Sequence, residues 1–170
     1  MTARAVTAIE PLETEHFPLL AQWLSSADLN QWLTGDWRDR AIDPVLVAVA
    51  TRNKRNRFFL VRCDGEPCGL VALADLDTVD RIAMVWYALG VPAFGGRGVI
   101  TDALRQLVDL AFRELGIEAL HAWIMEDNVR SRRVLEKTGF RECGRLRLAT
   151  SHNGRRMDRV YFDVTASDRR

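Results

Sequence analysis

The apolar positions of the chain recur with two periods, which predict a mixed series of strands and helices in its first half. A weak alternation of apolar and polar residues predicts a first strand over residues 4–10. Apolar spacing typical of helices covers residues 12–24 and 44–50. Runs rich in apolar and β-branched residues then predict three strands, at 58–62, 68–76 and 81–89. The first two of these strands are joined by DGEP at 64–67, which is typical of a hairpin turn.

Helical and strand-like segments alternate in the second half. Residues 100–115 have apolar side chains at helical spacing, and Gly116 then supplies a C-terminal stop. A strand is predicted over 119–125, and a short helix over 128–137. Strand-like runs follow at 140–151 and 155–164, joined by the hairpin signal Asn153-Gly154. This order predicts a mixed α/β fold with an antiparallel first half and a crossover in the middle.

Length, composition and charge bound the class of protein. The chain has 170 residues, of which 48% are hydrophobic, and no repeat or linker-like segment divides it, so we expect a single domain over residues 1–170. A net charge of +1 argues against a dedicated nucleic-acid partner. The sequence shows no leader pattern and no apolar run near the roughly 18 residues that span a bilayer. We therefore expect a cytoplasmic protein without a membrane partner.

Cysteine and histidine usage gives no sign of a metal site. The cysteines are odd in number and lack paired metal-site spacing, and the histidines are scattered along the chain. We expect reduced, half-buried thiols at Cys63, Cys68 and Cys143, and no bound metal.

Three glycines, Gly95, Gly96 and Gly98, lie between the strand predicted over 81–89 and the helix predicted over 100–115. Such a junction can bind phosphate, because free N–H groups and the positive end of the helix dipole meet there. The Walker A motif is absent, since no Gly-Lys-Ser/Thr follows. A Rossmann pattern fails because position 101 is threonine and Glu118 opens a strand instead of ending one. Without further motifs, a simple flexible connection explains the glycines equally well.

Two longer motifs favour a binding role. The segment FGGRGVITDAL at 94–104 and the segment EDNVRSRRVLEKTGF at 126–140 together resemble the GNAT acyltransferase superfamily, whose Q/R-x-x-G-x-G/A loop binds the pyrophosphate of acetyl-coenzyme A. The resemblance is greatest to the branch that acetylates protein N-termini, including those of ribosomal proteins. That branch shares N-x-x-S-x-R-V-L-E-K-x-G-F, here Asn128 to Phe140, and the later Gly144, Asn153-Gly154 and Asp158.

The resemblance implies a fold and an activity. The GNAT fold has a mixed central sheet of about six to seven strands flanked by about four helices. The implied activity is transfer of an acetyl group from acetyl-coenzyme A, without a metal, by direct attack of a primary amine. The acceptor would be a protein or peptide N-terminus, or a small amine such as an amino sugar or amino acid, and the enzyme a monomer or homodimer. The alternatives are an antibiotic- or polyamine-modifying member and a non-catalytic acyl-coenzyme A-binding module.

The resemblance also assigns the residues that bind the donor. The loop runs from Gly95 to Ile100, and the diphosphate would be bound by Arg97 and by the N–H groups of Gly96, Gly98, Ile100 and Thr101. The pantetheine arm would pair with the strand end at Leu89, Gly90 and Val91, where Gly90 permits a local splay. Asn128 would contact the donor and also cap its helix, and Arg132 or Arg133 would meet the 3′-phosphate.

Several positions depart from the family pattern. Gly95 and Ile100 replace the usual Gln/Arg and Gly/Ala, so Ile100 is expected to face the core while its N–H still donates. Leu135 stands where many relatives have a tyrosine acid, and Met84 and His121 stand where they have an acidic residue.

The catalytic groups are therefore less determined than the donor-binding ones. Ser131 is the candidate acid for the leaving thiolate, or merely a residue of the first helical turn. Tyr87 is expected in the core and His121 in a strand with its polar atoms satisfied. Bases acting through water could be Asp75, Asp77, Glu126 or Asp127. The absence of a strong base favours an amine of low pKa. An α-amine, with a pKa of about 8, fits this better than a lysine amine, with a pKa of about 10.4.

Overall fold

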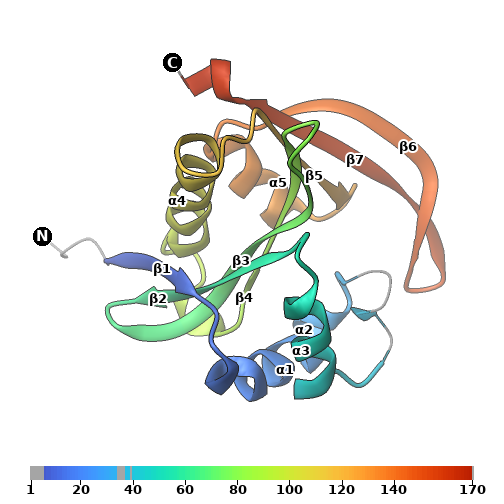
Figure 1. Ribbon diagram of the computed structural model, residues 1–170. Helices are drawn as coiled ribbons and strands as arrows, with labels where there is room; N and C mark the ends of the chain where they lie inside the picture. Colours follow the sequence, from blue (N-terminus) through green and yellow to red (C-terminus); the bar gives the residue numbers. More distant parts are fainter. Residues whose placement is uncertain (1–5, 34–36, 39, 170) are drawn as a thin grey trace, which may run out of the picture.

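A computed structural model describes residues 6–33, 37–38 and 40–169 of the chain. Its centre is a seven-stranded sheet with the order β1-β2-β3-β4-β5-β7-β6 (Figure 1). Pairing is antiparallel throughout except between β4 and β5, which are parallel. The strands are β1 (Thr7–Pro11), β2 (Arg57–Cys63), β3 (Glu66–Asp77), β4 (Ile82–Leu89), β5 (Ala119–Met125), β6 (Arg141–His152) and β7 (Arg155–Thr165).

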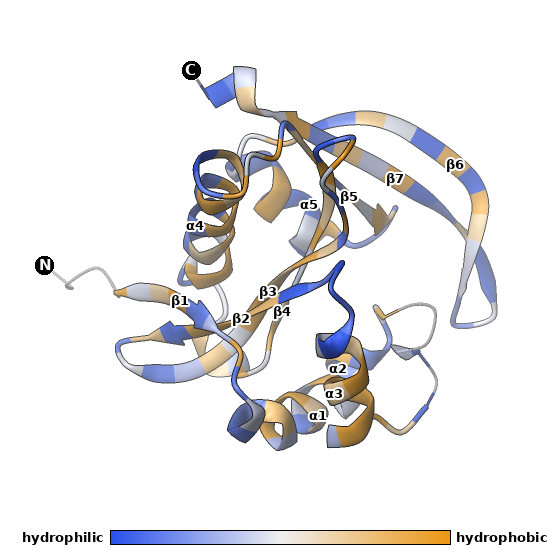
Figure 2. Cartoon of the chain, in the orientation of Figure 1, coloured by the Kyte–Doolittle hydropathy of each residue, from blue (hydrophilic) through white to orange (hydrophobic). Residues whose placement is uncertain are grey.

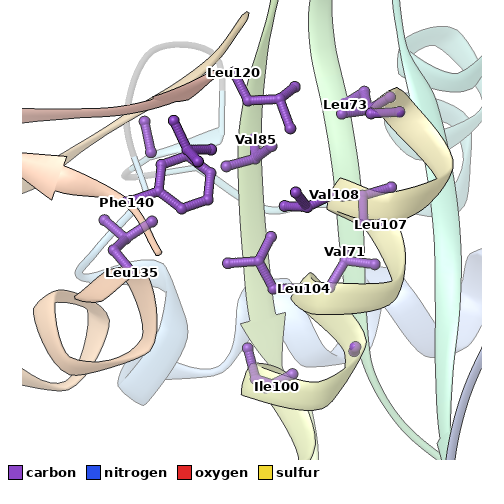
Figure 3. Close-up of a cluster of buried hydrophobic side chains, with 14 of the residues drawn as sticks. Val71, Leu73, Val85, Ile100, Leu104, Leu107, Val108, Leu120, Leu135 and Phe140 are labelled. Carbon is purple, nitrogen blue, oxygen red and sulfur yellow. The ribbon is translucent and has the colours of Figure 1, made fainter. Parts of the chain in front are cut away.

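Helices cover both faces of this sheet. They are α1 (Phe17–Ser25), α2 (Ala27–Asn30), α3 (Pro44–Arg52), α4 (Val99–Arg113) and α5 (Val129–Lys137). The first three pack on one face and α4 and α5 on the other (Figure 1), so the sheet buries two separate hydrophobic clusters. The larger cluster lies under α4 and α5, where Leu104, Leu107, Leu120 and Leu135 meet (Figure 3). In the described ranges, no helix is long and apolar enough to cross a membrane.

The predicted fold class and element order are confirmed. The extra helix is α2, a single turn that the sequence pattern did not predict. The first helix begins at Phe17 instead of residue 12, because a short 3-10 turn over Thr14–His16 precedes it. The first strand begins at Thr7 within the described residues, and residues 4–5 of its predicted range lie outside them. Strand β3, predicted over residues 68–76, begins earlier, at Glu66, and Pro67 lies beside an irregularity in the β2–β3 ladder.

Both predicted hairpins form, each through two residues with positive φ. Asp64 and Gly65 have φ of 52° and 86°, and Asn153 and Gly154 have φ of 47° and 74°. Two consecutive residues with positive φ match the right-handed twist of the flanking strands. The second turn joins β6 and β7 into a long arm at one side of the sheet (Figure 1). Its outer strand, β6, alternates between hydrophilic and hydrophobic residues (Figure 2).

The parallel strands β4 and β5 are joined along only part of their length. Their pairing covers Ile82–Met84 on β4 and Ala119–His121 on β5. Beyond these residues the ladder contains no further β4–β5 pair in the part of the chain that the structure describes. The sheet is therefore split between the C-terminal halves of two neighbouring strands, which leaves two backbone edges facing a gap.

Candidate active site

The glycine loop presents an uninterrupted row of free backbone donors. Gly96 and Gly98 have φ of 74° and 79°, a region that glycine enters at little cost. Gly98 is the N-cap of α4, and its carbonyl accepts the first helical hydrogen bond, from Asp102. Within the described residues, none of the N–H groups from Gly96 to Thr101 donates a hydrogen bond. This row lies at the positive end of the dipole of a 15-residue helix, an arrangement that favours binding of an anion.

Ile100 shows how a bulky residue fits this loop. Its side chain is 9% exposed and packs into the cluster under α4 (Figure 3), whereas its N–H belongs to the free row. Val99 adds a free N–H that sequence reasoning omitted, because the start of α4 fixes which donors lack partners.

Basic side chains surround the free donors. A pocket of about 400 Å³ is lined by Arg97, Gly98, Thr101, Asp102, Arg105 and Lys137. Arg105 lies 2.8 Å from the carboxylate of Asp102, and Arg97 lies 3.4 Å from that of Asp64. Lys137 makes no ion pair with any residue that the structure describes. The sequence pattern did not single out Lys137 for this pocket, although Lys137 belongs to the E-K-x-G-F part of the family motif.

The structure separates the two arginines proposed for the 3′-phosphate. Arg132 is bound to Glu142 at 2.8 Å and to Glu136 at 3.8 Å, and it lies over the Phe162 ring. Arg133 is exposed and has no ion-pair partner among the described residues, one helical turn before Lys137 on α5. Arg133 is thus the one available to a ligand phosphate.

Gly90 has a structural reason that the sequence did not reveal. A Cβ atom at this position would lie 2.1 Å from the ring of Trp23, so the indole can pack here only because residue 90 has no side chain. The N–H groups of Gly90 and Val91 both donate to the carbonyl of Cys68, at 2.8 Å and 3.0 Å. The split between β4 and β5 begins well before Gly90, after Met84. Gly90 therefore kinks the end of β4 against α1, and the split does not depend on it.

A larger cavity of about 500 Å³ opens on the α1–α3 side of the split. Its walls come from α2, α3, β4 and β5 and include the indoles of Trp32, Trp37, Trp86 and Trp123. At the split itself the lining residues are Tyr87, Asn128 and Ser131. None of the described residues that line this cavity carries a charge.

Tyr87, Asn128 and Ser131 meet at this junction. Asn128 accepts a hydrogen bond from the Ser131 N–H at 3.2 Å, so it caps α5 as expected. The Tyr87 hydroxyl donates to the Ser131 carbonyl at 3.0 Å, and burial raises the pKa of Tyr87. Tyr87 packs against the core, as predicted, but it also faces the cavity. The Ser131 hydroxyl has no hydrogen-bond partner in the described part of the chain, so it remains available to a ligand.

The carboxylates considered as bases do not line the cavity. Glu126 accepts from the Asp158 N–H and is paired with Arg145, and Asp77 accepts from the Val79 and Asp80 N–H groups, which lowers its pKa. Asp75 and Asp127 are also absent from the lining. Both Glu126 and Asp77 are therefore structural.

His121 differs from the expectation that its polar atoms are satisfied. Its ring makes no hydrogen bond within the residues described, although it lies on β5 beside the cavity residue Met84. Burial lowers the pKa of His121, and the nearby Asp75 carboxylate partly offsets this effect. Leu135, the counterpart of a tyrosine acid, is fully buried under α4 (Figure 3). In the described ranges, no three metal-ligating side chains lie close enough together to bind an ion.

Comparison with known proteins gives a consistent result. The family described as "Acetyltransferase (GNAT) domain" matches residues 7–141. The chain is 38% identical over 101 residues to "Putative ribosomal N-acetyltransferase YdaF" of Bacillus subtilis, covering 59% of this chain and 55% of that protein. It is 30% identical over 139 residues to "Spermidine N(1)-acetyltransferase" of Escherichia coli, covering 81% and 74% of the two chains.

A solved structure has the same fold at lower identity. A spermidine N-acetyltransferase from Vibrio cholerae, in complex with CoA and spermine, superposes with a TM-score of 0.84 at 17% identity and covers 95% of this chain and 96% of that one. The chain spans about half the length of the Bacillus subtilis relatives it matches: 55% of YdaF, and 40% of a second relative, "Probable N-acetyltransferase YjcK".

Proposed function

Because this chain belongs to the GNAT acetyltransferase domain family, we propose that it transfers an acetyl group from acetyl-coenzyme A to a primary amine. The observation that carries this proposal is the row of free N–H groups from Gly96 to Thr101. The row begins a long helix, is flanked by basic side chains and lies beside the split between β4 and β5. A diphosphate followed by an extended amide-bearing arm fits this sequence of anion site, gap and cavity.

Each part of the donor has a matching group in the protein. The N–H groups from Gly96 to Thr101 would bind the diphosphate, with Arg97 adding charge. Arg133 and Lys137 would bind the 3′-phosphate. The free edge of β4 from Val85 to Leu89 would hydrogen-bond to the pantetheine amides. The expected pairing does not extend to the N–H groups of Gly90 and Val91, because both already donate to the carbonyl of Cys68.

The reaction needs a neutral amine and a departing thiolate. Acetyl-coenzyme A supplies an activated thioester, and the protein orients it at the split. Ser131, with its unpartnered hydroxyl, would donate a proton toward the leaving sulfur. No described carboxylate or lysine lines the cavity to deprotonate the acceptor. An α-amine suits such a site, because at neutral pH far more of it is neutral than of a lysine amine.

The proposal extends to the surroundings of the site. The acceptor would be a peptide or protein N-terminus, an amino acid or another small amine, and residues 1–170 would act as one domain. The free thiols of Cys63 and Cys68 are buried and fit a reducing compartment such as the cytoplasm. A polyamine acceptor is the second candidate, since two relatives are named as spermidine acetyltransferases.

The test combines donor binding with turnover. Acetyl-coenzyme A should raise the melting temperature, because a hundredfold excess of ligand over its Kd stabilises the native state by about 2.7 kcal/mol. Gly98→Val should abolish this shift, because it strains a backbone with φ of 79° and places a branched side chain where the diphosphate approaches. Thiol release with an amine panel then separates an enzyme from a non-catalytic acyl-coenzyme A-binding module.

Gly116→Val provides a matched control. Gly116 follows the opposite end of α4, has φ of 66° and has open space around its missing side chain, as Gly98 does. The control should lose comparable stability and keep the full donor-induced shift. A full shift in Gly98→Val would contradict the assignment of the loop.

A further inference from the structure

One side-chain hydrogen bond bridges the split between β4 and the segment that follows β5. The Tyr87 hydroxyl of β4 donates to the carbonyl of Ser131, in the first turn of α5, at 3.0 Å. Tyr87 lies beyond Met84, the last residue of β4 that pairs with β5. Among the hydrogen bonds of the residues that the structure describes, this is the one that joins β4 to α5. It therefore connects the two sides of the split where the backbone ladder no longer does.

The other contacts of the first turn of α5 do not fix its distance from β4. Helix α5, all of which is described, has one buried residue, Leu135, and this lies a full turn further along the helix. The cap formed by Asn128 binds the Ser131 N–H within the turn itself. Arg132 is paired with a glutamate of β6, on the other side of the helix from β4. The Tyr87 hydroxyl is thus the group that ties this turn to β4.

The chemistry of the phenol suits a fixed hydrogen-bond donor better than an acid. Burial raises the pKa of Tyr87 above its ordinary value of 10.0. A phenol is already a weaker acid than a thiol with a pKa of about 8.5, so proton transfer from Tyr87 to a leaving thiolate is unfavourable. The raised pKa increases this difference and keeps the hydroxyl protonated throughout the neutral range. Its proton is also directed at a backbone carbonyl, which takes no part in the reaction.

On the premise that the chain is the proposed acetyltransferase with Ser131 as its proton donor, we infer that Tyr87 is a positioning residue, whose hydroxyl holds that of Ser131 at the split. It acts through the backbone. Tyr87 binds the carbonyl of Ser131 and Asn128 binds its N–H, so the peptide groups on both sides of the Ser131 Cα are held. The Oγ atom is then placed by a single staggered torsion. Such precision matters, because misplacing a reacting group by about 1 Å can lower a rate about 100-fold.

The experiment is a double-mutant cycle of Tyr87→Phe and Ser131→Ala. Thiol release gives kcat at saturating acetyl-coenzyme A, with whichever of a tetrapeptide, a free amino acid and spermidine has the highest kcat/KM in the parent. Tyr87→Phe keeps the ring and removes only the hydroxyl. It should lower kcat about 3–10-fold, as expected for loss of one hydrogen bond, and change the KM for acetyl-coenzyme A less than about twofold. In the Ser131→Ala background it should change kcat less than about twofold, because no hydroxyl remains to be oriented.

Tyr161→Phe is the matched control. Tyr161 is the other tyrosine of the chain and lies on β7, and its hydroxyl makes no hydrogen bond within the described residues. It is not among the described residues that line the cavity. Both kcat and the KM for acetyl-coenzyme A should therefore match the parent. The melting temperature is measured for every variant, and a loss of folded protein would lower kcat equally in both backgrounds of the cycle.

The outcomes separate this inference from the proposed function. A loss in Tyr87→Phe that disappears in the Ser131→Ala background supports the inference. Parent-like kcat in Tyr87→Phe, or the same loss in both backgrounds, overturns the inference while the acetyltransferase activity is retained. Parent-like turnover of Ser131→Ala also overturns it, because Tyr87 would then have no proton donor to orient. No thiol release by the parent with any of the three acceptors overturns the proposed function and the inference together.

Discussion

Asn128 connects helix stability with the proposed donor site. Its side-chain oxygen accepts from the Ser131 N–H, and the residue also lines the cavity at the split. Asn128→Ala should cost about 1 kcal/mol of unfolding free energy, because a cap is lost. It should also raise the KM for acetyl-coenzyme A, which steady-state kinetics would measure.

Asp43→Ala is the matched control for this substitution. Asp43 caps α3 by accepting from the Leu46 N–H at 2.8 Å and is not among the described residues that line the cavity. The Asp43→Ala variant should lose a similar amount of unfolding free energy and keep the parent KM for acetyl-coenzyme A. If Asn128→Ala also keeps that KM, Asn128 is only a cap.

Ser131 presents a hydroxyl without a partner among the described residues, directly at the split. Coenzyme A is a fair leaving group, since a thiol with a pKa of about 8.5 leaves at neutral pH with only modest assistance from a proton donor. Ser131→Ala should therefore lower kcat about 10–100-fold, near the low end for general acid catalysis, and leave donor binding nearly intact. The defect should shrink with an acyl donor whose thiol has a lower pKa. Parent-like turnover would reduce Ser131 to a helix residue.

At the scale of elements, the local features were predictable and the gap between β4 and β5 was not. The glycine loop, both hairpin turns and the amphipathic α4 depend on neighbours close in sequence, so their residues identify them. The end of β4–β5 pairing after Met84 depends on strands that are joined by a crossover. The contact of Gly90 with Trp23 likewise joins distant segments, so the sequence offered only a conformational reason for that glycine.

The packing of α1 against the end of β4 leads to a prediction at Gly90. Gly90→Ala would place a methyl carbon 2.1 Å from the nearest atom of the Trp23 ring, so one of the two segments must move. We expect a loss of about 1–3 kcal/mol in unfolding free energy, typical of overpacking, with a changed tryptophan fluorescence spectrum. Gly144→Ala on β6 is the control, because nothing lies within 4 Å of its added methyl group. Equal stability of the two variants would contradict this packing.

At the scale of the whole molecule, the cavity proposed for the acceptor is assembled from segments far apart in the chain. The cavity joins α2 and α3 to β4 and β5, and two basic residues of the β6–β7 arm, His152 and Arg159, lie against indoles that line it. The residues of the proposed donor side could be suggested from the sequence, because their motifs are contiguous and shared with a family. Arg159 and the tryptophan cluster have no such motif, and only the folded chain brings them together.

The pH dependence of stability reports on His121 within this assembly. Burial lowers the pKa of His121 below its ordinary value of 6.5, so the unfolded chain takes up a proton at higher pH than the native chain does. Its share of stability is therefore complete above pH 6.5 and is lost progressively as the pH falls toward the folded-state pKa. The carboxyl groups of Asp77, Asp158 and Asp168, whose pKa values are lowered from 3.8, act in a more acidic window. Urea unfolding between about pH 7.5 and 5.5 should thus show a smaller loss of stability in His121→Gln than in the parent. An identical loss in both proteins would mean that His121 takes up protons equally in the folded and unfolded chains.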